Sequence, residues 1–219
     1  MDRFGAVWDN HRARIIANWE KRISHRDLVL VPGDISFAQD PNEDLATLHQ
    51  LPGQIVFVPG NHDRWAQGIT QTKLSRILDS FPSIHMLTFD KPFYETGKHL
   101  IVGYKGSEPQ ETGRWVAKHF NKTLEHARNA ADKASYAQMS GHTVIVTTHY
   151  APSAHERDVL APLQPALWLH GHAHVGGDDR HLIEKWERER VNPTQKCISA
   201  DYLGMVPIEV TGGLVFPPI

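Results

Sequence analysis

Short apolar runs recur along the chain, and four of them end in polar residues. These runs lie in DLVLVPGD (27–34), QIVFVPGN (54–61), HTVIVTTH (142–149) and ALWLHGH (166–172). An apolar run bounded by glycine or proline predicts a strand that is covered on both faces, as in parallel sheets. The polar residues would then lie at the carboxyl ends of strands, where α/β proteins bind their ligands.

The segments between these strands predict helices and a hairpin. PNEDLATLHQLPG predicts a helix that begins at Pro41 or Asn42 and ends before Gly53, which makes a strand, helix and strand unit. TQTKLSRILDSF places its apolar residues on one helical face. The remaining predictions are strands at 84–89, 92–95 and 99–104, a hairpin turn at 95–98 and a long helix at 113–138.

The two ends of the chain differ in pattern. Residues 3–22 carry apolar side chains at helical spacing, so we expect one helix there. Residues 176–196 are polar and charged and predict an excursion from the body, followed by closing strands at 197–204 and 206–210. Because no repeat or linker divides the sequence, we expect a single domain over residues 1–219.

Composition narrows the classes of function. The 219 residues are 40% hydrophobic and have a formal net charge of −2. The chain therefore lacks the excess of positive charge with which a dedicated nucleic-acid binder attracts phosphates. No apolar run reaches the roughly 20 residues of a membrane span, and the first residues lack a signal-peptide pattern, so we expect a cytoplasmic protein. With Cys197 as the single cysteine, any metal must be held by His, Asp or Asn.

Each polar cluster has a structural explanation beside the functional one. Asp34 could cap a helix, residues 61–63 could form a turn, and His149 could be a core histidine. The Gly-His-Ala-His of residues 171–174 is harder to explain in this way, because neighbouring imidazoles repel when charged and metal binding keeps them neutral. Imidazole, amide and carboxylate together suit Mn, Fe or Zn better than Mg or Ca.

In their order along the chain, the strands followed by G-D, G-N-H-D, a single His and G-H-x-H resemble the calcineurin-like metallophosphoesterase superfamily. The resemblance covers nearly the whole chain, from Asp27 to the predicted C-terminal strands. It implies an α/β fold in four layers, a two-layer β sandwich flanked by helices, with two divalent metal ions at the strand ends.

The resemblance also implies a ligand set. Asp34 would bridge the two ions, and Asn61, His149 and His172 would complete the ligands of one of them. His174 would reach the other ion. Such a pair of ions would neutralise the charge of a phosphate ester and generate the hydroxide that attacks phosphorus.

Further roles follow for the neighbouring residues. His62 would stand beside the substrate phosphate and assist the leaving oxygen, with Asp63 orienting its ring. Gly33 and Gly60 would let the backbone turn sharply beneath the metals. We expect the pocket walls at residues 104–115 and 151–165, and we assign Asp201 to a turn.

One motif of the family does not appear. The family pattern begins with a strand ending in D-x-H, which supplies two ligands to the ion that His174 reaches. Asp9 and His11 have this spacing, but on a helix such positions point about 200° apart, so we do not expect them to share an ion. We therefore expect one ion rather than two, an internal start at Met1 with the first strand missing, and either a destabilised fold or an aggregation-prone edge.

The sequence thus predicts a metal-dependent phosphoesterase that acts on a small-molecule monoester or diester. One alternative is a non-catalytic metal-binding or protein-binding module on the same fold, which the missing D-x-H favours and the presence of His62 and Asp63 disfavours. A nuclease is the other alternative, and the balanced charge makes nucleic acid the less favoured substrate.

Overall fold

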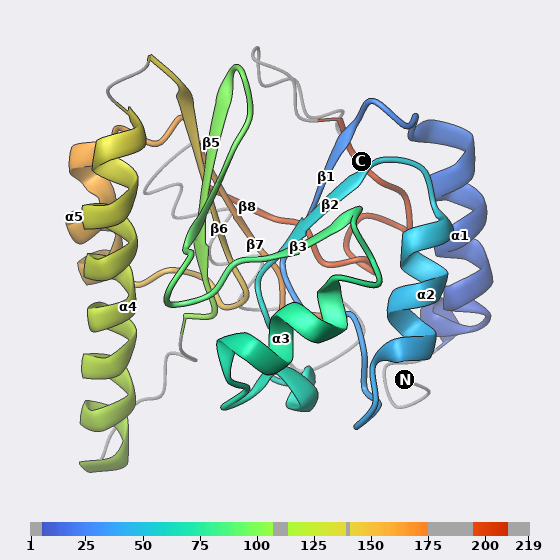
Figure 1. Ribbon diagram of the computed structural model, residues 1–219, viewed down its shortest axis with the longest axis horizontal. Helices are drawn as coiled ribbons and strands as arrows, with labels where there is room; N and C mark the ends of the chain where they lie inside the picture. The colour runs from blue at the N-terminus through green and yellow to red at the C-terminus, as the bar shows by residue number, and fades with distance from the viewer. Residues whose placement is uncertain (1–5, 107–113, 139–140, 175–194, 210–219) are drawn as a thin grey trace.

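The computed structural model describes residues 6–106, 114–138, 141–174 and 195–209. Within these ranges, two β-sheets pack face to face and helices cover both outer faces (Figure 1). The predicted four-layer α/β sandwich is therefore confirmed. None of the helices in the described ranges is both long enough and apolar enough to cross a membrane.

The first sheet has three parallel strands in the order β1-β2-β3. These are β1 (Leu28–Val31), β2 (Gln54–Phe57) and β3 (Ile84–Met86). β1 is one of the two edge strands of this sheet, and all four of its side chains are half-buried. The surrounding helical elements are α1 (His11–Arg22), α2 (Asn42–Gln50), η3 (Arg64–Ala66) and α3 (Gln71–Leu78).

The second sheet has the strand order β4-β5-β6-β7-β8, and only β4 runs antiparallel to its neighbour. Its strands are β4 (Phe93–Glu95), β5 (His99–Tyr104), β6 (Thr143–Thr148), β7 (Leu167–His170) and β8 (Gln195–Cys197). The predicted hairpin between β4 and β5 is confirmed, with Thr96 N donating to His99 O at 2.9 Å. The helices on this side are α4 (Arg114–Gln138), α5 (Ala154–Leu160) and η4 (Ala161–Leu163).

The alternation of side chains along the strands divides the core into three layers. In β2, Ile55 and Phe57 pack with Trp19 of α1 and Leu45 of α2, on the outer face of the first sheet. Val56, between them in sequence, faces the second sheet instead. Because β2 buries both faces, its unbroken apolar run in the sequence follows from its central position.

The N-terminal segment differs from its prediction as one helix over residues 3–22. A short 3-10 turn, η2 (Ala6–Trp8), is followed by Asn10 at φ 55°, and α1 begins only at His11. Asparagine adopts this left-handed conformation more readily than most residues, so it can interrupt a segment whose apolar spacing is helical throughout.

The C-terminal strands were predicted too far along the chain. β8 begins at Gln195 and ends at Cys197, so Gln195 and Lys196 belong to the sheet rather than to the excursion. Residues 200–205 form a turn, in which Gly204 and Met205 have left-handed φ angles of 64° and 63°. Residues 206–209 form no strand, and the predicted excursion at 176–194 lies outside the described residues.

Candidate metal centre

The polar residues after four parallel strands come together between the two sheets. Asp34 and Asn61 follow β1 and β2 of the first sheet, and His149 and His172 follow β6 and β7 of the second. Asp34, His149 and His172 each offer a ligand atom within 4.8 Å of the other two. This is the cluster that the strand ends predicted, assembled from both sheets.

Asn61 joins this cluster through its side-chain oxygen. Its Oδ1 lies 2.7 Å from Nε2 of His149 and 3.1 Å from Nδ1 of His172. The carboxylate of Asp34 places Oδ2 3.6 Å from the same Nε2 of His149. Four side chains therefore direct oxygen and nitrogen atoms at one point, which is the arrangement that holds a divalent cation.

The protonation of His149 supports a cation at this point. Its Nδ1 lies 2.7 Å from Pro32 O, and because a carbonyl only accepts, Nδ1 carries the hydrogen. In the neutral ring, Nε2 then faces Asn61 Oδ1 acceptor to acceptor. Burial lowers the pKa of His149 to about 4 against the opposing charge of Asp34, so a proton does not fill this gap at neutral pH. The donor set fits a metal ion, with Pro32 O fixing the tautomer.

Two glycines allow the loops beneath this cluster to approach each other. Gly33 has φ 99°, and a Cβ there would lie 2.7 Å from Gly60 N. A Cβ on Gly60 would collide with the carboxylate of Asp34. The predicted sharp turn is thus confirmed at Gly33, whereas Gly60 is needed for the close approach of Asp34.

Asp63 connects the same loops through hydrogen bonds to their backbone. Its side chain is fully buried, and its oxygens accept from the backbone N–H groups of Asp34 (2.7 Å), Gly60 (2.8 Å) and Ser36 (2.9 Å). Burial raises the pKa of Asp63, and these N–H groups oppose that shift. We expected Asp63 to orient the His62 ring, but its carboxylate accepts hydrogen bonds from backbone N–H groups instead. Asp63 therefore braces the loops that carry Asp34 and His62.

His62 lies at the rim of the cluster. Its backbone N–H donates to Asp34 Oδ1 at 2.8 Å, which ties the main chain of one loop to the other. Its half-buried ring stacks on Phe37, with ring centroids 4.5 Å apart and an interplanar angle of 26°. The role of His62 as a proton donor stays a prediction.

His174 lies apart from the cluster formed by Asp34, His149 and His172. Its Nδ1 is 3.3 Å from Oδ1 of Asp201, a buried carboxylate that we had assigned to a turn. Asp201 does occupy the turn, where Oδ1 also accepts from Tyr202 N, but its contact with the His174 ring was not predicted. The expectation that His174 reaches a second ion stays a prediction.

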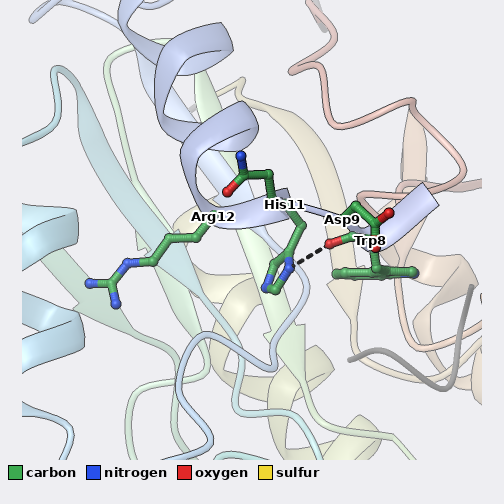
Figure 2. Close-up of a pocket in the computed structure, with 5 residues that line it drawn as sticks. Trp8, Asp9, His11 and Arg12 are labelled. Atoms are coloured by element: carbon green, nitrogen blue, oxygen red, sulfur yellow. Dashed lines mark hydrogen bonds between the residues drawn. The ribbon is translucent and has the colours of Figure 1, made fainter. Parts of the chain in front are cut away.

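The N-terminal segment packs next to His174. The ring of Trp8 meets the rings of His11 and His174 edge-on, at centroid distances of 5.2 and 5.3 Å. Residues 8–12 line a shallow cavity of about 490 Å³. Figure 2 shows the side chains that line it and the hydrogen bond between His11 Nδ1 and Trp8 O, which is 2.9 Å long. Asp9 precedes α1 rather than lying on it, so the helical argument that separated it from His11 was wrong. Neither residue belongs to the metal cluster found among the described residues.

Lys105 is a site residue that the sequence did not single out. It follows β5, and its carbonyl accepts from His149 N at 3.0 Å and from Tyr150 N at 3.1 Å. Burial lowers the pKa of Lys105, and the negative charges of Asp34 and Asp63 oppose that shift. The available signal was its position after a strand of the second sheet, within the expected wall at 104–115. Residues 107–113 of that wall lie outside the described ranges.

A comparison with models of protein families finds the calcineurin-like phosphoesterases, whose model matches residues 3–176. The matched range includes all four strand ends of the cluster and the loop that carries His62. Searches of curated proteins and of solved structures found no match.

Proposed function

Because the chain belongs to the calcineurin-like phosphoesterase family, we propose that it hydrolyses a small-molecule phosphate ester with bound divalent metal ions. One observation carries the proposal: Asp34, His149 and His172 bring ligand atoms within 4.8 Å of one another. Asn61 Oδ1 faces the nitrogen atoms of both histidines. A set of one carboxylate, one amide and two imidazoles suits Mn, Fe or Zn.

The metal would supply charge neutralisation at the phosphate and a more acidic water molecule. Asp34, Asn61, His149 and His172 would hold the well-formed site, and His174 would reach a second, weaker one. Asp34 would also hold the loop of His62, since its Oδ1 accepts a hydrogen bond from His62 N while its Oδ2 faces His149.

His62 would assist the departure of the leaving oxygen. Its ring lies at the rim, half-buried, and its main chain is fixed to the carboxylate of Asp34. Lys105, near Asp34 and Asp63, would attract the anionic substrate from the side of β5. In these roles, the metal ligands would hold the cations that neutralise the phosphate, and His62 would donate a proton to the leaving oxygen.

The test is hydrolysis of p-nitrophenyl and phenyl phosphate esters, as monoesters and diesters, by the Mn²⁺-loaded chain. We expect Mn²⁺-dependent turnover, and a His62→Ala variant that keeps its metal but loses about 10² to 10⁴ in kcat on a phenyl ester. His25→Ala, an exposed position before β1, serves as the control and should behave as wild type. A chain that binds Mn²⁺ but hydrolyses none of these esters would favour the non-catalytic module.

A further inference from the structure

The ring of His62 has a different partner from the one its sequence neighbour suggested. Asp63 directs its oxygens at three backbone N–H groups. The ring contact of His62 is with Phe37, at 4.5 Å between centroids and 26° between planes. Phe37 is 52% exposed, although a phenylalanine usually gains stability by burial. Its position is therefore better explained by the histidine that it covers than by the core.

We propose that Phe37 is a positioning residue, whose ring fixes the orientation of the His62 imidazole at the rim of the metal centre. The inference rests on the proposed function, because it concerns the step that His62 carries out. A stacked neighbour contacts only the face of an imidazole. Both ring nitrogens stay in their plane and remain open to a substrate, whereas a carboxylate partner would occupy one of them.

The segment before Phe37 is itself held in place. Ser36 is buried, its N–H donates to Asp63 Oδ1 at 2.9 Å, and its hydroxyl donates to Asp44 Oδ2 at 2.6 Å. Phe37 thus extends from a fixed point, and the His62 main chain is fixed separately by Asp34. In this arrangement Asp63 acts on His62 indirectly, through the backbone of Ser36 and the ring of Phe37.

The chain offers a matched control for this contact. Phe89 is also an exposed phenylalanine, at 44% exposure, and its ring lies 4.9 Å from that of His126. The Phe89 and His126 pair involves no residue of the metal centre. Phe37→Leu and Phe89→Leu therefore make the same chemical change beside a histidine, once at the site and once away from it.

Kinetics on two leaving groups gives the first readout. The weakly basic p-nitrophenolate departs without a proton, whereas phenolate needs one, so loss of His62 orientation should act mainly on the phenyl ester. Since stacking of two rings favours one arrangement roughly two- to tenfold, we expect Phe37→Leu to lower kcat on the phenyl ester by about that factor with KM unchanged. Phe37→Tyr should restore kcat, and Phe89→Leu should leave it at the wild-type value.

A double variant separates positioning from substrate binding. In a His62→Ala background, Phe37→Leu should cause no further loss of kcat. If Phe37→Leu instead raises KM for both esters equally, with or without His62, Phe37 is a platform for the substrate and the positioning role is overturned.

The NMR spectrum of the Zn²⁺-loaded protein tests the contact without turnover. Stacking shifts the ring-proton signals of His62, and Phe37→Leu should remove this shift while Phe89→Leu leaves it unchanged. Unchanged His62 signals in Phe37→Leu would overturn the positioning role alone. A wild-type chain that shows the shift but hydrolyses no ester would overturn the proposed function, and with it any part of Phe37 in catalysis.

Discussion

Oδ1 of Asn61 lies 2.7 Å from Nε2 of His149, although the two residues follow strands of different sheets. The hydrogen bond from His149 Nδ1 to Pro32 O leaves acceptors on both sides of this short distance. A cation between them would turn a repulsive contact into an attractive one. Metal binding should therefore also strengthen the packing of the two sheets against each other.

Metal loading should show this coupling directly. We expect about one Mn²⁺ per chain after gel filtration and elemental analysis, and a rise in unfolding free energy of about 2.7 kcal/mol at a hundredfold excess of metal over Kd. Asn61→Ala and His149→Ala should bind at least tenfold more weakly, since even supporting residues of metal sites contribute that much. They should also lose the stabilisation by Mn²⁺.

The control for metal loading is His25→Ala, because His25 is an exposed residue before β1. It should bind Mn²⁺ as wild type does. Full affinity in Asn61→Ala would contradict the ligand set. Two ions per wild-type chain would show that the second site is complete, with His174 and residues that we have not assigned.

Replacing Asp63 tests its bracing role. Asp63→Asn puts an amide N–H₂ where an oxygen now accepts from Gly60 or Ser36, and a buried donor facing a donor is unsatisfied. We expect a loss of about 2–3 kcal/mol in unfolding free energy, measured with urea, together with weaker metal binding. Asp79→Asn, at the exposed end of α3, should stay within about 0.5 kcal/mol of wild type. A stable Asp63→Asn variant that lost only kcat would restore the role of orienting His62.

The cluster could be predicted because its residues are marked locally. Each of Asp34, Asn61, His149 and His172 follows an apolar run, and parallel strands end at a common edge. The family pattern then indicated which of the polar residues meet. The same runs predicted covered strands, since β2, β5 and β6 are buried enough to leave an almost continuous apolar signal, whereas the four layers were implied by the family resemblance.

The missed features depend on contacts that the sequence pattern does not mark. Asp63 accepts hydrogen bonds from the backbone of residues up to 29 positions away. Because every residue except proline has the same backbone N–H group, the sequence does not mark which residues donate to it. The pair of His174 and Asp201 joins residues 27 positions apart. At Asn10 the helical spacing of apolar residues continues across a break in φ, because spacing reports which face is buried and not whether the backbone is continuous.

A methyl group at Gly60 should damage the site by geometry alone. Its Cβ would collide with the Asp34 carboxylate, so Gly60→Ala must displace the loop or the ligand. We expect a loss of about 1–3 kcal/mol in unfolding free energy and a large drop in Mn²⁺ affinity. Gly97→Ala is the matched control, since a Cβ there meets nothing within 4 Å, and it should match wild type in both measurements. Wild-type affinity in Gly60→Ala would mean that the two loops are further apart in solution.

Acid should destabilise the metal-free protein through a second histidine, His170. This side chain is buried in β7, and burial lowers its pKa from 6.5 to about 4. The unfolded chain therefore binds a proton in this interval that the folded chain does not, so stability is present above pH 6.5 and is lost as the pH falls toward 4. Between pH 7.5 and pH 5, this one group should reduce the unfolding free energy by about 2 kcal/mol.

Urea unfolding in EDTA at these two pH values measures the effect, since EDTA removes metal-linked protonation. His170→Gln has no imidazole to protonate, so its stability should fall by about 2 kcal/mol less than that of wild type over the same interval, whatever its stability at pH 7.5. His149, whose pKa burial also lowers to about 4, adds a loss of the same sign that both proteins share. The comparison thus isolates His170. Equal losses in the two proteins would mean that water reaches this ring in solution, and that the end of β7 opens beside the metal ligands.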